Sequence, residues 1–391
     1  MSGGRLRVAI GSVFPYDEIR VRGGVEAVCL SLVRALARRG DLELHVVTCN
    51  PRLQSSCTER RGAATFHWLA TGPRLYNLRA LTVNAWRVRQ VYERIQPQVI
   101  HAENGSEYAL GAPGGVPLVL TVHGLELLAP AMRRSAQFRG PIGWYRRATG
   151  RWILERSVRK SNAVISIAGD YVPRFLGRML GGKPVHCIPN PIADDAWPEV
   201  RHEGDPEPLV LCVGDIIERK NALGLVRAFA ELRHRVPAAR LCLAGGTSEP
   251  AYLARVQEEI GKLGLQAQVE LPGRLDQARL RATYARAAVV AQASIQETAP
   301  MAVAEAMTFG KPVVATRAGG TAALVQEGVT GHLVDVGDMR HLADRLEELL
   351  LDEGRRQSLG RAAREAAERQ FSAAIVAART VEVYRSLLPD P

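Results

Sequence analysis

Residues 297–312 of this 391-residue chain read Glu-Thr-Ala-Pro-Met-Ala-Val-Ala-Glu-Ala-Met-Thr-Phe-Gly-Lys-Pro. Thr298 can cap a helix, and Pro300 fits the first turn of one. Gly310 suits the end of a helix, and Pro312 prevents its continuation. The stretch therefore predicts one short helix with defined ends, followed by a buried strand.

Two carboxylates stand eight residues apart in this stretch. Glu297 lies in the loop before the predicted helix, and Glu305 lies inside it. Eight helical residues rise about 12 Å, which exceeds the roughly 5 to 9.5 Å between the two carboxyl groups of a glycosidase. The helix N-terminus between them offers N–H groups and a positive dipole end, which suit a phosphate. The pair predicts two anchors for one extended ligand that carries phosphate and sugar hydroxyls.

Apolar strand-like runs alternate with helical patterns along the whole chain, which predicts α/β domains with parallel, doubly wound sheets. A polar, proline-containing stretch at 193–208 predicts a linker, so that two Rossmann-like units would meet at a cleft. The expected strands are residues 6–12, 43–48, 65–69, 98–101, 117–122, 162–167, 184–188, 209–213, 240–244, 268–271, 288–293 and 312–316. The expected helices include residues 24–39, 220–236, 249–263, 276–287, 300–309, 338–352, 353–370 and 371–388.

These features resemble the retaining glycosyltransferases of family 4, whose mark is a Glu-x7-Glu element in a GT-B fold. The resemblance rests on the two glutamates, the delimited helix, the following strand and Gly319-Gly320. It implies two Rossmann-like domains facing each other across a cleft, with a C-terminal helix that crosses back. The expected domains are residues 1–192 for the acceptor, 193–370 for the nucleotide-sugar donor, and 371–391 for the returning helix.

The resemblance also implies an activity. The protein would be a hexosyltransferase that moves a sugar from a UDP- or GDP-sugar to an acceptor hydroxyl with retention of anomeric configuration. The acceptor would be a glycan, a lipid-linked sugar or a small molecule, most often in cell-envelope synthesis. GT-B enzymes generally require no metal, so neither a metal nor another cofactor is expected.

Residue roles follow from matching the family's motifs. The resemblance assigns catalysis to His123, Glu297 and Lys220. It assigns the transferred sugar to His123, Glu297, Thr298 and Ala299. It assigns the nucleotide and its diphosphate to Gly23, Gly24, Arg219, Lys220, Met301 and Glu305, with Glu305 on the ribose. Independently of the family, His123 ends an apolar strand and should emerge at its carboxyl end; His101, which ends another strand, is a second candidate.

Three positions depart from the family's pattern. Asp215 stands where the family commonly has Arg; because a carboxylate repels a diphosphate, we expect Asp215 to turn away and pair with Arg219 or Lys220. Pro300 lacks the N–H that a glycine-rich loop would offer to sugar hydroxyls. Ala323 replaces a frequent Glu. Sugar specificity therefore cannot be carried over.

Composition points to a partner and a compartment. The net charge is +11, and residues 1–195 hold 27 Lys and Arg against 14 Asp and Glu. Residues 130–183 hold twelve basic and two acidic residues with interleaved aromatics, which predicts a surface that rests on anionic lipid; no nucleic-acid-binding module is present. The start of the chain has no signal-peptide pattern, and the six cysteines have no C-x-x-C spacing. We expect a cytoplasmic or peripheral membrane protein with small buried cysteines.

Other classes of function remain open at this point. A non-catalytic nucleotide-sugar-binding subunit would keep the scaffold without the missing Arg, and an epimerase or phosphorylase could share the fold. A dehydrogenase is weakly supported because no G-x-G-x-x-G follows the first strand. Release of nucleoside diphosphate on adding an acceptor would separate a transferase from a binding subunit.

Overall fold

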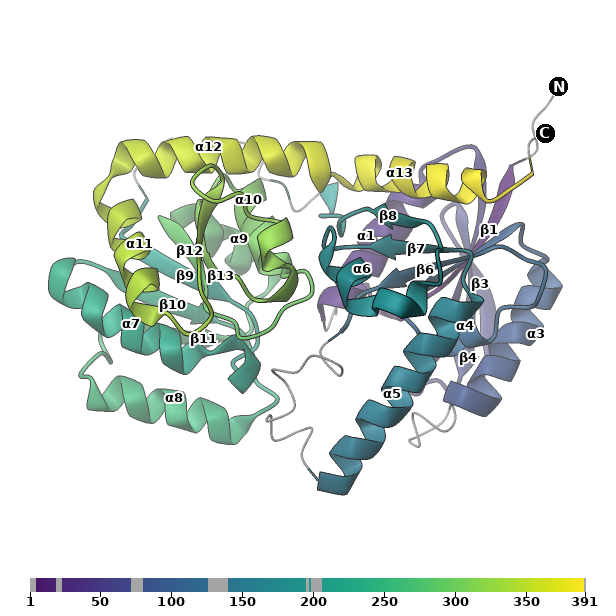
Figure 1. The fold of residues 1–391 in the computed structure, drawn as a ribbon, viewed down its shortest axis with the longest axis horizontal. Coiled ribbons are helices and arrows are strands. Elements are labelled where there is room, and N and C mark those ends of the chain that lie inside the picture. Colours follow the sequence, from purple (N-terminus) through teal and green to yellow (C-terminus); the bar gives the residue numbers. More distant parts are fainter. Residues whose placement is uncertain are drawn as a thin grey trace. The chain divides into compact units, whose positions relative to one another are not determined.

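The computed structural model describes residues 5–18, 23–71, 80–125, 140–194, 197 and 206–389. These residues divide into two compact units, each with its own sheet flanked by helices (Figure 1). The first unit contains the described residues up to Ala193 and those from Ser372 onward, and the second contains those from Asp194 to Phe371. Most of the predicted linker at 193–208 lies outside the described residues, and so do residues 126–139.

The first unit is built on an eight-stranded sheet with the order β3-β4-β2-β1-β5-β6-β7-β8. Its neighbouring strands are parallel except for β3 and β4, which are antiparallel. The strands are β1 (Leu6–Gly11), β2 (Leu42–Asn50), β3 (Cys57–Arg61), β4 (Ala64–Ala70), β5 (Val99–Glu103), β6 (Leu118–Val122), β7 (Ala163–Ser166) and β8 (Val185–Cys187). The helices are α1 (Gly24–Ala37), η1 (Ala80–Asn84), α3 (Ala85–Ile95), α4 (Glu107–Leu110), α5 (Gly140–Lys160), α6 (Tyr171–Leu176), η4 (Gly177–Leu180) and α13 (Ala373–Ser386).

The second unit has a six-stranded parallel sheet with the order β11-β10-β9-β12-β13-β14. Its strands are β9 (Leu209–Val213), β10 (Arg240–Ala244), β11 (Val269–Gly273), β12 (Val289–Gln292), β13 (Val313–Thr316) and β14 (Gly331–Val334). Its helices are η6 (Glu218–Lys220), α7 (Ala222–Arg235), α8 (Pro250–Lys262), α9 (Gln277–Arg286), α10 (Met301–Thr308), η7 (Gly319–Ala323), α11 (Met339–Leu351) and α12 (Glu353–Gln370). Each unit has a largely parallel, doubly wound sheet, which confirms the predicted α/β class.

The strands read as continuous apolar runs because helices cover both faces of a parallel sheet. In β6 and β13 every residue is buried. Strands β2, β8 and β11 are only partly buried. Strand β3, which the sequence analysis did not predict, has the sequence Cys-Thr-Glu-Arg-Arg and is largely exposed at the sheet edge. It forms because a tight turn at Gly62, with φ of +58°, folds it back onto β4. Because the turn forms this strand, the strand needs no apolar sequence pattern from which it could have been predicted.

The C-terminal helix α13 packs on the first unit. Val376, Val381 and Tyr384 of this helix are buried in the same core as residues of β1, β2 and α1. The core of the second unit is separate and is formed by α7, α8, α11 and the inner strands. The predicted return of the last helix to the N-terminal half of the chain is therefore confirmed.

Two local predictions can be compared with the structure. The helix expected at 300–309 is α10 (Met301–Thr308), whose N-cap is Pro300. The predicted short helix with defined ends is therefore present, beginning just after Pro300. Cys57 and Cys187 are exposed, whereas the sequence analysis expected small buried cysteines. Both lie in edge strands, where one face has no helix over it.

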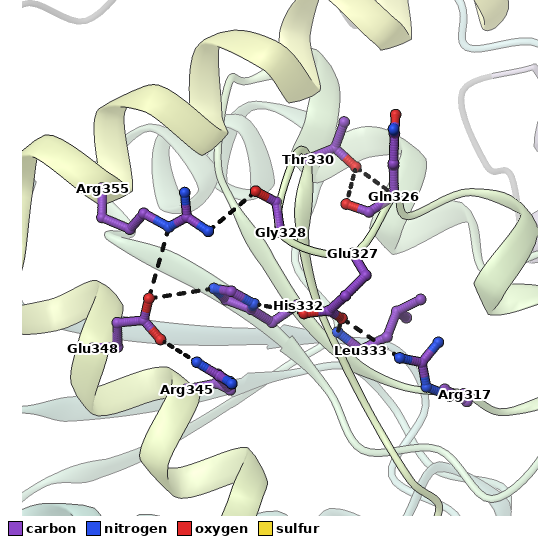
Figure 2. Close-up of polar contacts among 10 residues, drawn as sticks. All are labelled: Arg317, Gln326, Glu327, Gly328, Thr330, His332, Leu333, Arg345, Glu348 and Arg355. Atoms are coloured by element: carbon purple, nitrogen blue, oxygen red, sulfur yellow. Dashed lines mark hydrogen bonds and ion pairs between the residues drawn. The ribbon is translucent and has the colours of Figure 1, made fainter.

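A turn before β14 is tied to the helices that follow it (Figure 2). Glu327 accepts hydrogen bonds from the Leu333 N–H and lies 3.0 Å from Nδ1 of the buried His332. On the other side of His332, Glu348 of α11 lies 3.7 Å from Nε2. Arg355 of α12 is 3.7 Å from Glu348 and donates to the Gly328 carbonyl at 3.1 Å. These contacts hold the turn and β14, which is the edge strand of the sheet and pairs with β13.

Glu327→Ala is expected to lower the free energy of unfolding by about 1 to 3 kcal/mol, because the Leu333 N–H loses its acceptor. Burial alone would raise the pKa of Glu327, but His332 and the Leu333 N–H outweigh it and lower the pKa. The stabilisation is therefore present at neutral pH and should disappear as the pH falls through the folded-state pKa. Urea midpoints of wild type and variant across pH measure this. Arg317→Ala is the control: its side chain is 46% exposed and 3.8 Å from Glu327, so its loss should change little, and an equal loss would contradict the assignment.

Candidate active site

The candidate site of the second unit lies where its strand order reverses. β9 and β12 are neighbours in the sheet, with β10 continuing on one side and β13 on the other. In doubly wound sheets, ligands bind beyond the carboxyl ends of the strands at such a reversal. Two loops begin there: the β9 loop (residues 214–221) and the β12 loop (residues 293–300).

The two loops are joined to each other through Arg219. Its carbonyl accepts from the Ile295 N–H at 2.8 Å, and its Nη1 donates to the Gln296 carbonyl at 2.8 Å. Glycines in the adjacent segments let the backbone pack closely against both loops. A Cβ at Gly319, whose φ is +56°, would lie 2.0 Å from the Glu297 carbonyl oxygen, and one at Gly245 would lie 1.9 Å from the Gly214 oxygen. At these two positions the backbone is packed so closely that no side chain would fit.

Glu297 is the centre of the site. Its side chain is buried and its carboxylate has four partners. Lys220 Nζ lies 2.6 Å from Oε1, and Arg219 Nη1 lies 3.0 Å from Oε2. Ser294 Oγ donates to Oε1 at 2.7 Å, and Gln292 Nε2 donates to it at 3.1 Å. Burial alone would raise the pKa of Glu297, but the two cations outweigh it and lower the pKa, so the group is a carboxylate.

Arg219 and Lys220 both reach Glu297 although they are adjacent in the chain. They end the short turn η6, and Asn221 follows in the left-handed region, with φ of 56°, before α7 begins. Their side chains remain 17% and 18% exposed. A lysine has three donors and an arginine five, so each can hold Glu297 and a further anion.

Asp215 does not have the partner that the sequence analysis expected. The pairing with Arg219 or Lys220 was wrong: Arg274 Nη2 lies 3.1 Å from Asp215 Oδ1. Both side chains are about half exposed. The cations of the β9 loop are instead drawn to Glu297, because a buried carboxylate needs a counter-charge more than a solvated one does.

Glu305 lies on α10, apart from this ion-pair group, and has a different partner. Tyr284 of α9 donates to Glu305 Oε2 at 2.9 Å. Burial raises the pKa of Glu305 to about 6. The tyrosine is itself buried, and its ring stacks on Phe309 with centroids 5.1 Å apart. At neutral pH most of Glu305 is ionised, with its orientation set by a rigid donor.

The remaining predicted residues of this unit lie beside Glu297. Thr298 is buried, whereas Ala299 and Met301 are partly exposed at the start of α10. The sequence analysis missed Gln292, Ser294, Tyr284 and Arg274. Gln292 and Ser294 could have been found, because polar residues at the carboxyl end of a buried strand are the signal that identified His123.

In the first unit, Gly23 is the N-cap of α1 and Gly24 is its first residue. A Cβ at Gly23 would meet nothing within 4 Å, so that its backbone is open to a ligand. His123 follows β6 and is 7% exposed. Its Nε2 bonds to Glu103 at the end of β5. The predicted place of His123 at a strand's carboxyl end agrees with the structure.

His101 has a different environment from His123. It is 1% exposed, and both ring nitrogens are bonded: Nδ1 to Tyr384 Oη and Nε2 to Thr121 Oγ1, each at 2.7 Å. Burial lowers the pKa of His101, so its ring is neutral. A histidine enclosed in this way links elements of the fold, and we do not assign it a ligand contact.

One group in the described part of the chain contains side chains of the metal-binding type. Ligand atoms of Cys29, Glu103 and His123 all lie within 4.8 Å of one another, and all three residues are buried. The sequence analysis saw no such group around His123, because Cys29 comes from α1 and Glu103 from another strand. Burial raises the pKa of Cys29, so its thiol stays protonated, and Glu103 already accepts a hydrogen bond from His123. Zinc bound here would have to deprotonate this thiol and replace the hydrogen bond between Glu103 and His123.

The comparisons with known proteins agree with this architecture. The family model described as "Glycosyltransferase Family 4" matches residues 22–196, and the one described as "Glycosyl transferases group 1" matches residues 194–366. The chain belongs to glycosyltransferase family 4. This family 4 protein is 29% identical to a D-inositol 3-phosphate glycosyltransferase from Xylanimonas cellulosilytica, over 97% of the chain and 96% of the relative.

Two further proteins are similar to this chain. A GDP-mannose-dependent alpha-(1-6)-phosphatidylinositol monomannoside mannosyltransferase from Mycolicibacterium smegmatis is 29% identical over 61% of this chain and 68% of its own. A sucrose-phosphate synthase from Thermosynechococcus elongatus superposes with a TM-score of 0.81, at 22% identity, over 98% of this chain and 99% of that one. The last likeness supports the GT-B fold. The family 4 chain is therefore a glycosyltransferase enzyme.

Gly319→Ala tests whether the close packing behind Glu297 is needed. The new Cβ would force the Glu297 carbonyl to move, so we expect weaker nucleotide-sugar binding. We also expect the free energy of unfolding to fall by more than the about 1 to 2 kcal/mol that a left-handed alanine alone costs. Gly264→Ala is the matched control, because its φ is +67° and a Cβ there meets nothing within 4 Å. Thermal unfolding and calorimetric titration with UDP- and GDP-sugars measure both effects. If the two variants lose stability equally and bind as wild type does, the packing is not required.

Proposed function

We propose that this family 4 glycosyltransferase moves a hexose-type sugar from a UDP- or GDP-sugar to an acceptor hydroxyl, with retention of anomeric configuration. The observation that carries the proposal is the buried Glu297 carboxylate held by Lys220 and Arg219 at the carboxyl ends of β12 and β9. Two cations around one carboxylate leave one positive charge in excess. That excess suits a diphosphate leaving group whose charge grows in the transition state.

Each predicted residue then has a role. Lys220 and Arg219 hold the diphosphate, aided by the backbone N–H groups at the starts of α10 and α1, beside Met301 and Gly23-Gly24. Glu297 accepts from the hydroxyls of the transferred sugar, with Thr298 and Ala299 beside it. Glu305 accepts from the ribose hydroxyls. His123 contacts the sugar from the first unit.

The chemical step breaks the bond between the anomeric carbon and the diphosphate oxygen and forms a bond to the acceptor oxygen. The acceptor proton passes to the departing diphosphate. Glu297 is held by four donors, which makes it a poor nucleophile and favours its role in binding. Because Lys220 and Arg219 supply the positive charge, we propose that the reaction needs no metal and proceeds in EDTA.

The acceptor is proposed to be a hydroxyl-rich glycan, lipid-linked sugar or small polyol of cell-envelope synthesis. The names of the two curated relatives, which mention inositol 3-phosphate and a phosphatidylinositol mannoside, support this class. A non-catalytic binding subunit is the alternative. Nucleoside diphosphate released by wild type on addition of an acceptor distinguishes the two.

Glu297→Ala and Glu305→Ala separate the two carboxylate roles. Glu305→Ala should weaken free nucleoside diphosphate and the full donor alike, each by about tenfold, because both contain the ribose. Glu297→Ala should weaken only the sugar-bearing donor and lower turnover by about 10² to 10³, while free diphosphate binds as well as or better than before, since a nearby negative charge is gone. Calorimetry and diphosphate release measure these quantities.

The control for this pair is Glu270→Ala, which removes a half-exposed carboxylate of the same unit whose partner is Arg240. It should change neither affinity nor turnover. Loss of free diphosphate binding in Glu297→Ala that equals its loss of donor binding would show the assignment to be wrong. Wild type that binds a donor but transfers nothing would favour the binding subunit.

We also propose that the enzyme works at the inner face of the cytoplasmic membrane, in contact with anionic lipid through α5. No helix in the described ranges combines the length and apolar character of a membrane span. On α5, Trp144 and Trp152 are 66% and 50% exposed. At 100° per residue they share a face, roughly a third of a turn wide, with Arg151, Arg159 and Glu155, and Glu155 lies 2.6 Å from Arg159. Indoles at headgroup depth beside guanidinium groups on phosphates are the pattern of an interfacial helix.

Vesicle flotation tests this surface. Wild type should bind vesicles containing anionic lipid, bind neutral vesicles weakly, and detach as salt shortens the screening length below about 8 Å. The double variant Trp144→Ala/Trp152→Ala should lose most of the binding. Trp86→Ala is the matched control, because Trp86 is 61% exposed on α3 outside this face. Binding that ignores lipid charge, or is lost equally in the control, argues against the proposal.

A further inference from the structure

Glu103 is a buried carboxylate in the first unit that no sequence motif singled out. It ends β5, is 2% exposed, and lies between two histidines. Its Oε2 bonds to Nε2 of His123, and its Oε1 lies 3.4 Å from Nε2 of His101. Burial alone would raise the pKa of Glu103, but the two histidines outweigh it and lower the pKa. An ionised carboxylate only accepts hydrogen bonds, so Nε2 of His123, which bonds to it, must carry a proton.

The directions of these bonds can be followed into the C-terminal helix. Burial raises the pKa of Tyr384 well above its ordinary value, so its phenol keeps its proton and can donate to Nδ1 of His101. The neutral His101 then carries its proton on Nε2, facing Thr121 Oγ1 at 2.7 Å and Glu103. The chain of donors runs from Tyr384 through His101 to Thr121 Oγ1, and the same His101 nitrogen lies 3.4 Å from Glu103. His123 donates to Glu103 from the opposite side.

We propose that Glu103 is a positioning residue that fixes the ring orientation and tautomer of His123. The inference rests on the proposed function, in which His123 contacts the transferred sugar. Because Nε2–H is committed to Glu103, the other ring nitrogen, Nδ1, is the one left to meet a sugar hydroxyl. A histidine whose one nitrogen is held by a buried carboxylate keeps a single tautomer, and loss of the holding group commonly lowers activity.

The sheet places Glu103 where this role requires it. β5 and β6 are parallel neighbours with Glu103 paired to Thr121, two residues before His123. Glu103 also sits at the strand reversal of the first unit, because β5 lies beside β1 and continues to β6. This is the position in a doubly wound sheet where ligand-binding side chains gather.

Glu103→Gln is the first variant to examine. A carboxamide has one acceptor oxygen and one donor nitrogen, so it can present either to His123, and the tautomer of His123 is no longer fixed. Turnover is expected to fall by about 10- to 100-fold, with free nucleoside diphosphate bound as in wild type. Glu103→Asp keeps the charge and should recover part of the lost turnover.

A double-mutant cycle distinguishes positioning from general damage. If Glu103 acts through His123, then His123→Ala/Glu103→Gln should be no slower than His123→Ala alone. Tyr384→Phe is the control, because it removes a buried hydrogen bond from the far end of the same network. It should lower the melting temperature but leave turnover within about threefold of wild type. Additive losses in the cycle, or equal losses of turnover in Tyr384→Phe and Glu103→Gln, would overturn the proposal.

A spectroscopic arm does not depend on turnover. In wild type with ¹⁵N-labelled histidine, assigned with His123→Ala, the neutral ring of His123 should carry its proton on Nε2, and Glu103→Gln should change this pattern. A wild-type ring protonated on Nδ1 alone, or stoichiometric zinc in the purified protein that is lost in Cys29→Ser, would overturn the inference. Wild type inactive with every donor would instead count against the proposed function, and the tautomer result would still judge the role of Glu103.

Discussion

The second unit is organised around the burial of one negative charge. An isolated carboxylate in an apolar interior is unfavourable by several kcal/mol, so Glu297 can remain ionised only with partners on every side. Those partners come from three places: the end of β12, the loop that follows it, and the β9 loop. Each partner fixes the segment that carries it. The glycines at positions 245 and 319, which follow β10 and β13, let the adjacent backbone pack closely against Gly214 and Glu297 of these two loops.

The first unit uses the same principle with a different counter-charge. Glu103 is as deeply buried as Glu297, but histidines surround it in place of Lys and Arg. The two sites therefore differ in kind. Lys220 and Arg219 carry permanent charge and suit a diphosphate, whereas the ring of His123 carries hydrogen-bond direction and suits a hydroxyl. In both units the carboxylate orients the side chains that would meet a ligand.

The sequence predicts this fold well because parallel strands are apolar along their whole length, and helices between them end at glycine and proline. Glu297 in a loop, Glu305 in a helix and His123 at a strand end were all placed from such local signals. What the sequence could not predict depends on contacts distant in the chain. His101 meets Tyr384 across 283 residues, and the pairing of Asp215 with Arg274 spans 59. Short or polar edge strands such as β3 and β14 carry no periodic pattern at all.

The departure at Asp215 can now be judged by charge. Arg274 neutralises Asp215 at the surface, so the local sum of these two groups is zero. Glu297 with Lys220 and Arg219 sums to one positive charge in a partly buried place, where the effective dielectric is lower and each charge acts more strongly. An Asp at position 215 in place of the family's Arg therefore need not make the site negative, because Arg274 offsets the charge of Asp215. Under the proposed function, the excess positive charge for a diphosphate would come from the β9 loop, with Arg219 supplying the charge that position 215 lacks.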